Sequence, residues 1–291
     1  MHKLFGYPGG KWPVRHMVVS VFPEHKTYVD VFGGSAAILL TKEKSPGEVF
    51  NDKNEQLVNF FRVVKHRPAE LAERARLWLH SRTLWDRLKN DQTPFDEVEN
   101  AIRFWIRLVD SFGGMGKNYG MTREGIRSVT RAKAYLDEVA ARLSDVHIEC
   151  LSFEKVINFY GGPETFLYCD PPYRGTRGGD TNYSQLTDDE WRLLLDKLSS
   201  FGGKFLLSSN PDPFVLKLFK AFNIREIDVR VTLPRSGKNT IRKEVLISNY
   251  RLPIIRRKIR RATPSPDRRM NHSLDPGIAK QTDRKRDLLK K

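Results

Sequence analysis

The stretch Thr165-Phe166-Leu167-Tyr168-Cys169-Asp170-Pro171-Pro172-Tyr173 decides the fold, because an apolar strand runs directly into a polar turn stiffened by proline. Ligands of open α/β sheets bind outside the carboxyl ends of the strands, so this turn should face a site. A carboxylate and a main-chain carbonyl each accept a hydrogen bond from an NH2 group, and an aromatic ring stacks on a base. Asp170, Pro171, Pro172 and Tyr173 therefore suit an exocyclic amine, and the alternative is a Pro-Pro turn with a packing tyrosine.

Strand and helix signals alternate through most of the chain, which is typical of a parallel sheet covered by helices. The clearest helix is Thr187 to Leu198, because Thr187 and Glu190 form a capping box before apolar residues. The sequence thus predicts an α/β fold with a seven-stranded sheet. Its candidate strands are Tyr28 to Phe32, Glu48 to Asn51, Val146 to Cys150, Thr165 to Cys169, Lys204 to Ser208, Arg225 to Leu233 and Glu244 to Ser248.

About ninety residues separate the second and third strands, far more than the 2 to 6 typical of α/β connections. This segment carries its own helical patterns, from Asn54 to Val64, from Pro68 onward and from Glu97 to Phe112. We therefore expect residues 54–145 to form an inserted, mostly helical subdomain, with a main domain made of residues 1–53 and 146–250.

The charge of the chain favours a polyanionic partner. Its 291 residues hold 51 Lys and Arg against 35 Asp and Glu, a net charge of +16. Residues 251–291 hold fourteen Lys and Arg against four Asp, so this basic tail should be disordered. No apolar run is long enough to predict a membrane span, the first twenty residues do not have the pattern of a secretory leader, and Cys150 and Cys169 follow no zinc or disulfide spacing. We expect a soluble intracellular protein with both cysteines in its core.

A glycine-rich turn follows the first candidate strand, at Asp30-Val31-Phe32-Gly33-Gly34 before the apolar start of a helix at Ser35 to Ala37. Glycines let the backbone approach a ligand closely, which suits the amino-acid and ribose parts of a bound cofactor. A tight turn without a ligand would have the same sequence. Asp52 ends the second strand, where an acid commonly holds ribose hydroxyls or caps the next helix.

Two further loops combine glycine with cations. Tyr7-Pro8-Gly9-Gly10-Lys11-Trp12 could close over a cofactor carboxylate or a base, or form a poorly ordered terminus. Arg235-Ser236-Gly237-Lys238-Asn239 links the last two strands and could contact phosphates or form a solvated hairpin tip.

Taken together, these segments resemble the Dam-like, D12-class DNA adenine N6-methyltransferases over Phe5 to Tyr250. The order is the same: a Gly-Gly-Lys loop, a cofactor glycine loop, a target-recognition insertion and Asp-Pro-Pro-Tyr. The resemblance implies a Rossmann-like methyltransferase sheet, S-adenosylmethionine as the methyl donor, double-stranded DNA as the substrate, no metal and a cytoplasmic location in a bacterial or phage-infected cell.

The resemblance also implies residue roles. Asp170 and the Pro171 carbonyl would bind the N6 amine, and Tyr173 would stack on an adenine flipped out of the duplex. Lys11 would lie near the methionine end of the cofactor or the flipped base, and Asp52 would hold the ribose. The cofactor pocket would comprise Tyr7, Gly10, Lys11, Asp30, Phe32, Gly33, Gly34, Asp52 and Asp170.

Within the insertion, Arg123 and Arg127 are candidates for phosphate or guanine contacts, although a salt-bridged helix surface would have the same spacing. The other candidate DNA contacts are Lys117, Asn118, Tyr119, Arg235 and Lys238.

Three other functions fit parts of the pattern. One is methylation of an RNA adenine or another amine, and a second is a DNA-binding relative without catalysis. A nicotinamide dehydrogenase would require Gly-x-Gly-x-x-Gly, whereas Gly33 and Gly34 are adjacent.

Overall fold

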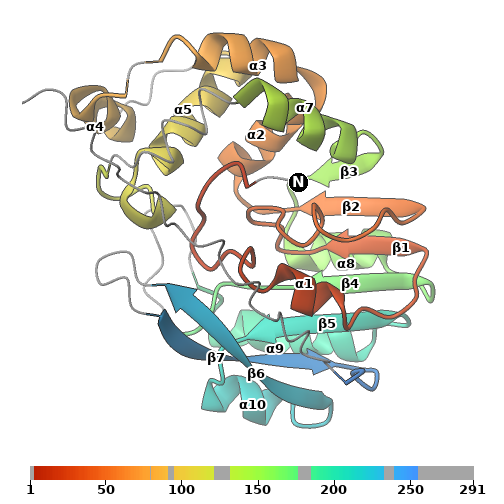
Figure 1. The fold of residues 1–291 in the computed structure, drawn as a ribbon. Helices are drawn as coiled ribbons and strands as arrows, with labels where there is room; N and C mark the ends of the chain where they lie inside the picture. Colours follow the sequence, from red (N-terminus) through yellow and green to blue (C-terminus); the bar gives the residue numbers. More distant parts are fainter. Residues whose placement is uncertain are drawn as a thin grey trace, which may run out of the picture. The chain divides into compact units, whose positions relative to one another are not determined.

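A computed structural model describes residues 3–78, 80–90, 95–120, 132–175, 185–232 and 239–254. Within these ranges seven strands form one sheet in the order β3-β2-β1-β4-β5-β7-β6 (Figure 1). The seven-stranded α/β sheet expected from the sequence is confirmed. Its strands are β1 (Thr27–Asp30), β2 (Gly47–Asn51), β3 (Val146–Glu149), β4 (Thr165–Cys169), β5 (Lys204–Ser209), β6 (Asn223–Thr232) and β7 (Asn239–Ser248).

The sheet is mixed, so the expectation of a parallel sheet is wrong at one edge. Strands β3, β2, β1, β4 and β5 are parallel to their neighbours, whereas β7 runs antiparallel to both β5 and β6. The reason is that six residues separate β6 from β7, too few for the crossover that parallel pairing needs, so these two strands pair antiparallel. Because β7 pairs with β6 along its whole length, it begins at Asn239 rather than at Glu244.

The strand order reverses between β1 and β4, and this reversal fixes the place of a ligand site. The chain runs outward from β1 through β2 to β3, then returns to β4 on the other side of β1. The register pairs Asp30, the last residue of β1, with Tyr168, two residues before Asp170. Two strands therefore end side by side with acidic residues at a topological switch point, where α/β folds bind ligands.

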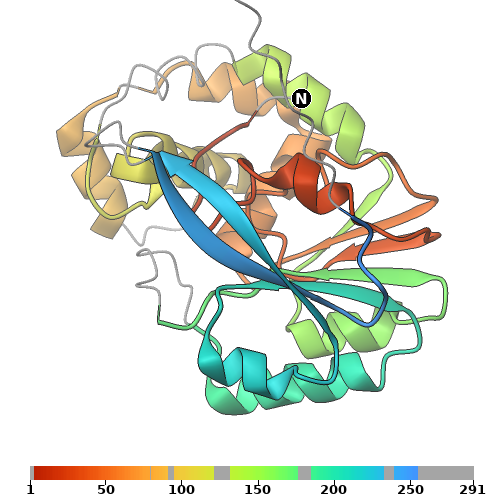
Figure 2. The same cartoon turned by 60° about the horizontal axis from the view of Figure 1, so that its bottom comes forward.

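Alternate residues of β4 build the two halves of the core. Phe166 and Tyr168 pack into one apolar cluster, and Leu167 and Cys169 pack into the other. Because both faces of β4 are covered, the strand is apolar throughout. In Figure 2, α8, α9 and α10 lie on one face of the sheet and α1 on the opposite face. These helices are α1 (Arg15–Val19), α8 (Phe153–Tyr160), α9 (Asp188–Ser199) and α10 (Pro213–Leu218).

The segment between β2 and β3 is helical and shares a core with the sheet. Asn54 caps its first helix by accepting hydrogen bonds from two backbone amides, and Phe61 on that helix packs 4.9 Å from Phe50 of β2. The Trp105 indole donates to the Leu4 carbonyl at 3.0 Å. A separate subdomain at residues 54–145 stays a prediction. The inserted elements are α2 (Glu55–His66), α3 (Pro68–Ala75), α4 (Arg82–Asn90), α5 (Glu97–Val109), the short 3-10 turn η1 (Phe112–Gly114) and α7 (Ala132–Leu143).

Three local expectations from the sequence are wrong. The apolar residues after the glycine turn form successive turns rather than a regular helix, because Ala36 adopts a positive φ of 54°. Helix α5 ends at Val109 rather than Phe112, just before Gly113 and Gly114, which also have positive φ. Only Cys169 is a core residue, because Cys150 is partly exposed. None of the described helices has the length and apolar composition needed to span a membrane.

A buried ion cluster ties α7 to the start of β2. Lys42 and Arg142 both donate to the Glu48 carboxylate, with 2.8 Å between Arg142 Nη2 and Glu48 Oε1. Arg142 also donates to the Leu39 carbonyl at 2.8 Å. Burial alone would raise the pKa of Glu48, but the hydrogen bonds from Arg142 and Lys42 lower it below its ordinary value.

We expect Glu48→Gln to reduce the free energy of unfolding at pH 7 by about 3–5 kcal/mol, because it leaves two buried cations without their carboxylate. Folding lowers the pKa of Glu48, so its contribution is present above the unfolded-state pKa and is lost as the pH falls through the folded value. In urea titrations the deficit of the variant should therefore shrink at acidic pH. Lys44→Gln, which removes an exposed ion pair with Asp145, is the control and should leave the free energy of unfolding close to that of the wild type.

Candidate active site

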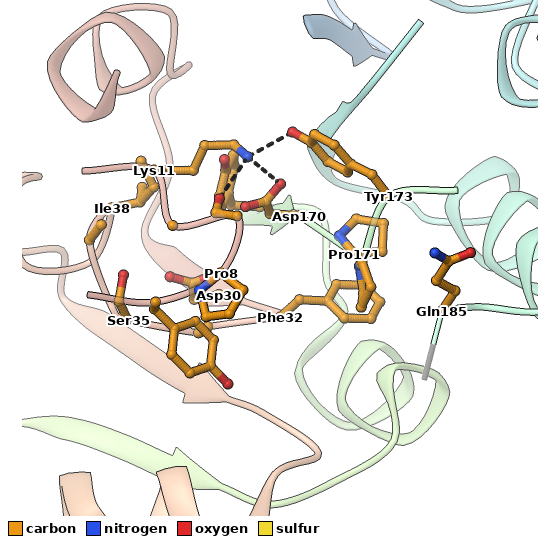
Figure 3. A pocket seen from close by; sticks show the side chains of 18 of the residues that line it. Pro8, Lys11, Asp30, Phe32, Ser35, Ile38, Asp170, Pro171, Tyr173 and Gln185 are labelled. Atoms are coloured by element: carbon orange, nitrogen blue, oxygen red, sulfur yellow. Dashed lines mark hydrogen bonds and ion pairs between the residues drawn. The ribbon is translucent and has the colours of Figure 1, made fainter. Parts of the chain in front are cut away.

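A pocket of about 430 Å³ opens at the carboxyl ends of β1 and β4 (Figure 3). Three segments far apart in the sequence form its wall: the N-terminal loop, the glycine turn after β1 and the Asp-Pro-Pro-Tyr turn after β4. The sequence-predicted residues that line it are Tyr7, Gly10, Lys11, Asp30, Phe32, Gly33, Gly34, Asp170, Pro171, Pro172 and Tyr173.

A buried ion pair joins two of these segments. Lys11 Nζ lies 2.7 Å from Asp170 Oδ1, and Figure 3 shows the two side chains directed at one another. Burial raises the pKa of Asp170 to about 6, although the Lys11 charge opposes the rise. Burial would lower the pKa of Lys11, but the Asp170 and Glu244 carboxylates overcome this and hold it above its usual range. Lys11 is therefore a permanent cation beside Asp170.

The N-terminal loop turns sharply to place Lys11 in the pocket. The Gly10 amide donates to the Tyr7 carbonyl at 3.0 Å, and Gly9 adopts a positive φ of 70° that favours glycine. A Cβ on Gly10 would lie 3.1 Å from the Tyr7 carbonyl oxygen. The Gly-Gly pair is thus needed for the turn.

Asp30 is a buried carboxylate with an unmet hydrogen-bonding capacity. It is 1% exposed and lines the pocket, yet its Oδ1 has no hydrogen-bond partner among the described residues. Burial, followed by the charge of Asp170, raises the pKa of Asp30 to about 8. A buried carboxyl group with one oxygen left without a partner fits a cationic hydrogen-bond donor, such as the ammonium of an amino-acid ligand.

The glycine turn after β1 is held by packing and by Asp52. A Cβ on Gly33 would lie 2.2 Å from a ring atom of Phe50, and Gly34 has a φ of 50°. Asp52 Oδ2 accepts from the Gly34 amide at 2.9 Å, and its Oδ1 accepts from the Asn54 amide at 2.8 Å. Asp52 is not among the residues that line the pocket, so its predicted contact with a ribose stays a prediction.

The predicted DNA contacts are not among the residues that line the pocket, or they lie outside the described residues. Lys117, Asn118 and Tyr119 follow η1, and the Tyr119 ring packs against Arg82, whose guanidinium lies 4.8 Å from the ring centroid. Trp85 makes an edge contact with the same ring at 6.1 Å. The candidates outside the described residues are Arg123, Arg127, Arg235 and Lys238.

The structure adds residues that the sequence analysis missed. Met115 reaches the pocket from the insertion and Arg242 from β7. Glu244 contacts both Lys11 and Tyr173. An acid at the start of the otherwise apolar run Val245 to Ile247 was the available signal for Glu244. Among the described residues, no group of three or more His, Cys, Asp or Glu side chains could hold a metal ion.

An α/β sheet with a pocket at its switch point, walled by a glycine turn and a strand-terminal Asp-Pro-Pro-Tyr, defines an S-adenosylmethionine-dependent methyltransferase of amines. The model of the D12 class N6 adenine-specific DNA methyltransferases matches residues 7–233, and the chain belongs to this family. It methylates the N6 amine of adenine in DNA, with S-adenosylmethionine as the methyl donor.

Curated relatives agree with this assignment. The chain is 26% identical over 290 residues to the type II methyltransferase M.MjaIII of Methanocaldococcus jannaschii, covering 84% of this chain and 97% of that protein. It is 27% identical over 271 residues to the type II methyltransferase M1.LlaDCHI of Lactococcus lactis subsp. cremoris, covering 84% and 94%. A solved SAM-dependent methyltransferase from Agrobacterium tumefaciens matches with a TM-score of 0.25 and 11% identity over 59% and 62% of the two chains, which is too slight to bear on the fold.

We expect Gly33→Ala to weaken S-adenosylmethionine binding at least tenfold, because the new methyl group must displace the Phe50 ring and with it the turn. Overpacking of this kind costs about 1–3 kcal/mol, so the melting temperature should fall as well. Calorimetric titration with S-adenosylmethionine measures the binding. Gly202→Ala is the control, because a Cβ there meets nothing within 4 Å. If the two variants bound S-adenosylmethionine equally well, the turn would not require glycine at position 33.

Proposed function

We propose that the protein is a site-specific DNA adenine methyltransferase (EC 2.1.1.72) that acts on an adenine flipped out of double-stranded DNA. The observation that carries the proposal is the buried Asp170 carboxylate, held beside Lys11 and followed by two prolines at the pocket wall. A DNA substrate places the enzyme in the compartment that holds the DNA, which is the cytoplasm in a bacterial or phage-infected cell.

The pocket would act mainly by positioning the amine. Asp170 and the Pro171 carbonyl would each accept a hydrogen bond from N6, and these bonds would stabilise the positive charge that develops there. Bound S-adenosylmethionine supplies an electrophilic methyl group on its sulfonium. The nitrogen gains the methyl group and then loses one proton, for which Asp170 is a suitable acceptor. Tyr173 would stack on the base with the ring face opposite Lys11, whose Nζ lies 4.7 Å from the ring centroid.

The remaining pocket residues would bind the methyl donor, S-adenosylmethionine. Asp30, with its unpartnered oxygen, would accept from the methionine ammonium. Gly33 and Gly34 would let the backbone approach the donor closely. Asp52 would support the ribose, directly or through the Gly34 amide that it already holds. The other proposed donor contacts are Tyr7, Gly10, Lys11 and Phe32.

We further propose that the insertion at residues 54–145 reads the DNA. Lys117, Asn118 and Tyr119 follow the turn that sends Met115 into the pocket, so the loop borders the site. The exposed Arg82 stacks on Tyr119, a cation held on an aromatic ring, and such a pair can contact phosphate. The net charge of +16 supports binding to a duplex.

The first test incubates the protein with tritiated S-adenosylmethionine and unmethylated genomic DNA, then maps N6-methyladenine by single-molecule sequencing. We expect methylation at one short motif. Asp170→Asn should lower the rate about 100- to 1000-fold, because it removes the charged acceptor that faces the amine, and should leave DNA affinity within about twofold. Asp145→Asn, which changes an exposed carboxylate, is the control. Incorporation into RNA or protein instead of DNA would overturn the proposed substrate.

The single-turnover rate should fall about tenfold per pH unit below pH 6. The carboxylate form of Asp170 is the acceptor, and its pKa is raised to about 6, so acid protonates it and removes the interaction. Rates measured from pH 5 to 8 test this, with S-adenosylmethionine binding measured at each pH to separate affinity from transfer. A flat profile across this range would exclude Asp170 as the ionised acceptor.

A further inference from the structure

Glu244 is a buried carboxylate beside the pocket that the roles proposed above do not use. It lies on β7 and is 5% exposed. Its Oε2 accepts a hydrogen bond from the Tyr173 hydroxyl at 3.0 Å and lies 3.6 Å from Lys11 Nζ. Strand β7 thus brings a second acid to the ion pair between Lys11 and Asp170.

The Tyr173 hydroxyl connects these charges. It accepts a hydrogen bond from Lys11 at 2.7 Å and donates one to Glu244, and it also lies 3.2 Å from Ser208 Oγ on β5. The phenol end of the ring is therefore fixed by three different segments of the chain. A hydroxyl that accepts from an ammonium and donates to a carboxylate is strongly oriented, because both bonds are charge-assisted.

The charges in this network are unequal, since two carboxylates share one ammonium. The Lys11 ammonium lies 2.7 Å from Asp170 Oδ1 and 3.6 Å from Glu244 Oε2. The negative charge of Glu244 opposes the effect of the Lys11 charge on Asp170, so without Glu244 the Asp170 carboxylate would hold a proton or an N–H donor less strongly. Glu244 therefore makes Asp170 a stronger acceptor than the ion pair alone would allow.

We propose that Glu244 is a positioning residue for methyl transfer: its charge opposes the effect of Lys11 on Asp170 and its hydrogen bond fixes the Tyr173 ring, so that the Asp170 carboxylate stays a strong acceptor for the adenine amine. The inference rests on the acceptor role proposed above for Asp170. Glu244 is not among the residues that line the pocket, and it acts through Lys11 and Tyr173.

The test compares Glu244→Gln and Glu244→Asp in single-turnover methylation of unmethylated genomic DNA from pH 5 to 9. Glu244→Gln should lower the maximal rate by up to about 100-fold, with KM for DNA within about twofold of wild type. In this variant the fall of the rate on the acidic side of the pH profile, called the acidic limb below, should move to lower pH, because the Glu244 charge helps to raise the pKa of Asp170. Glu244→Asp keeps the charge, so its acidic limb should lie at the wild-type pH, and its maximal rate should lie between those of the wild type and Glu244→Gln.

Glu48→Gln is the matched control, because it also removes a buried carboxylate from an ion cluster but lies outside the pocket. It should lose stability and keep the wild-type acidic limb. The inference is wrong if the acidic limb of Glu244→Gln lies at the wild-type pH, or if its maximal rate falls no further than that of Glu48→Gln. Glu244 would then have only a structural role. If Glu244→Gln does not fold, Glu244→Asp decides, and a fully wild-type rate overturns the inference.

Asp170→Asn distinguishes failure of this inference from failure of the proposed function. A fully active Asp170→Asn variant would overturn the acceptor role, and the role of Glu244 with it. An inactive Asp170→Asn variant beside an unshifted Glu244→Gln variant would overturn the role of Glu244 alone.

Discussion

The buried ion pair between Lys11 and Asp170 is the interaction on which the site depends. Both side chains are largely shielded from water, and removing Lys11 would leave the Asp170 and Glu244 carboxylates in the interior without their cation, which is strongly destabilising. The pair joins the N-terminal loop to the turn after β4, two segments that lie far apart in the sequence.

Close backbone contacts supply the second constraint. A Cβ on Gly114 would lie 2.5–2.6 Å from backbone atoms of Gly6, so no side chain fits between the insertion and the N-terminal segment. Tyr7 and Lys11 follow Gly6, whereas Met115 and Lys117 follow Gly114. The segment that carries the cation of the pocket therefore lies directly against the turn that leads to the proposed DNA-contacting loop. Neither can shift far without moving the other.

The sequence predicted the parts of the fold that depend on local patterns. The fully buried β4 and the capping box at Thr187 have local signals strong enough to place them correctly. The antiparallel β7 and the positive φ of Ala36 were missed, because strand direction and turn geometry depend on what each segment packs against. The same holds in the site: Asp170 follows a readable strand, whereas Glu244 gains its contacts only when β7 is placed beside β5.

The site has more carboxyl groups than cations. This excess of negative charge would favour both the binding of a cationic methyl donor and the positive charge that develops on the amine. Asp170 and Glu244 lie beside the single Lys11 ammonium, Asp30 lines the same pocket, and burial raises the pKa of Asp30 to about 8 and of Asp170 to about 6. A cationic donor relieves this repulsion, so its binding is favoured beyond shape alone. In the mechanism proposed above, transfer of the methyl group would convert the sulfonium into a neutral sulfide and move positive charge to N6, which we propose lies beside Asp170. The acids of the pocket would then attract the methylated amine more strongly than before transfer and the neutral sulfide less strongly than the sulfonium.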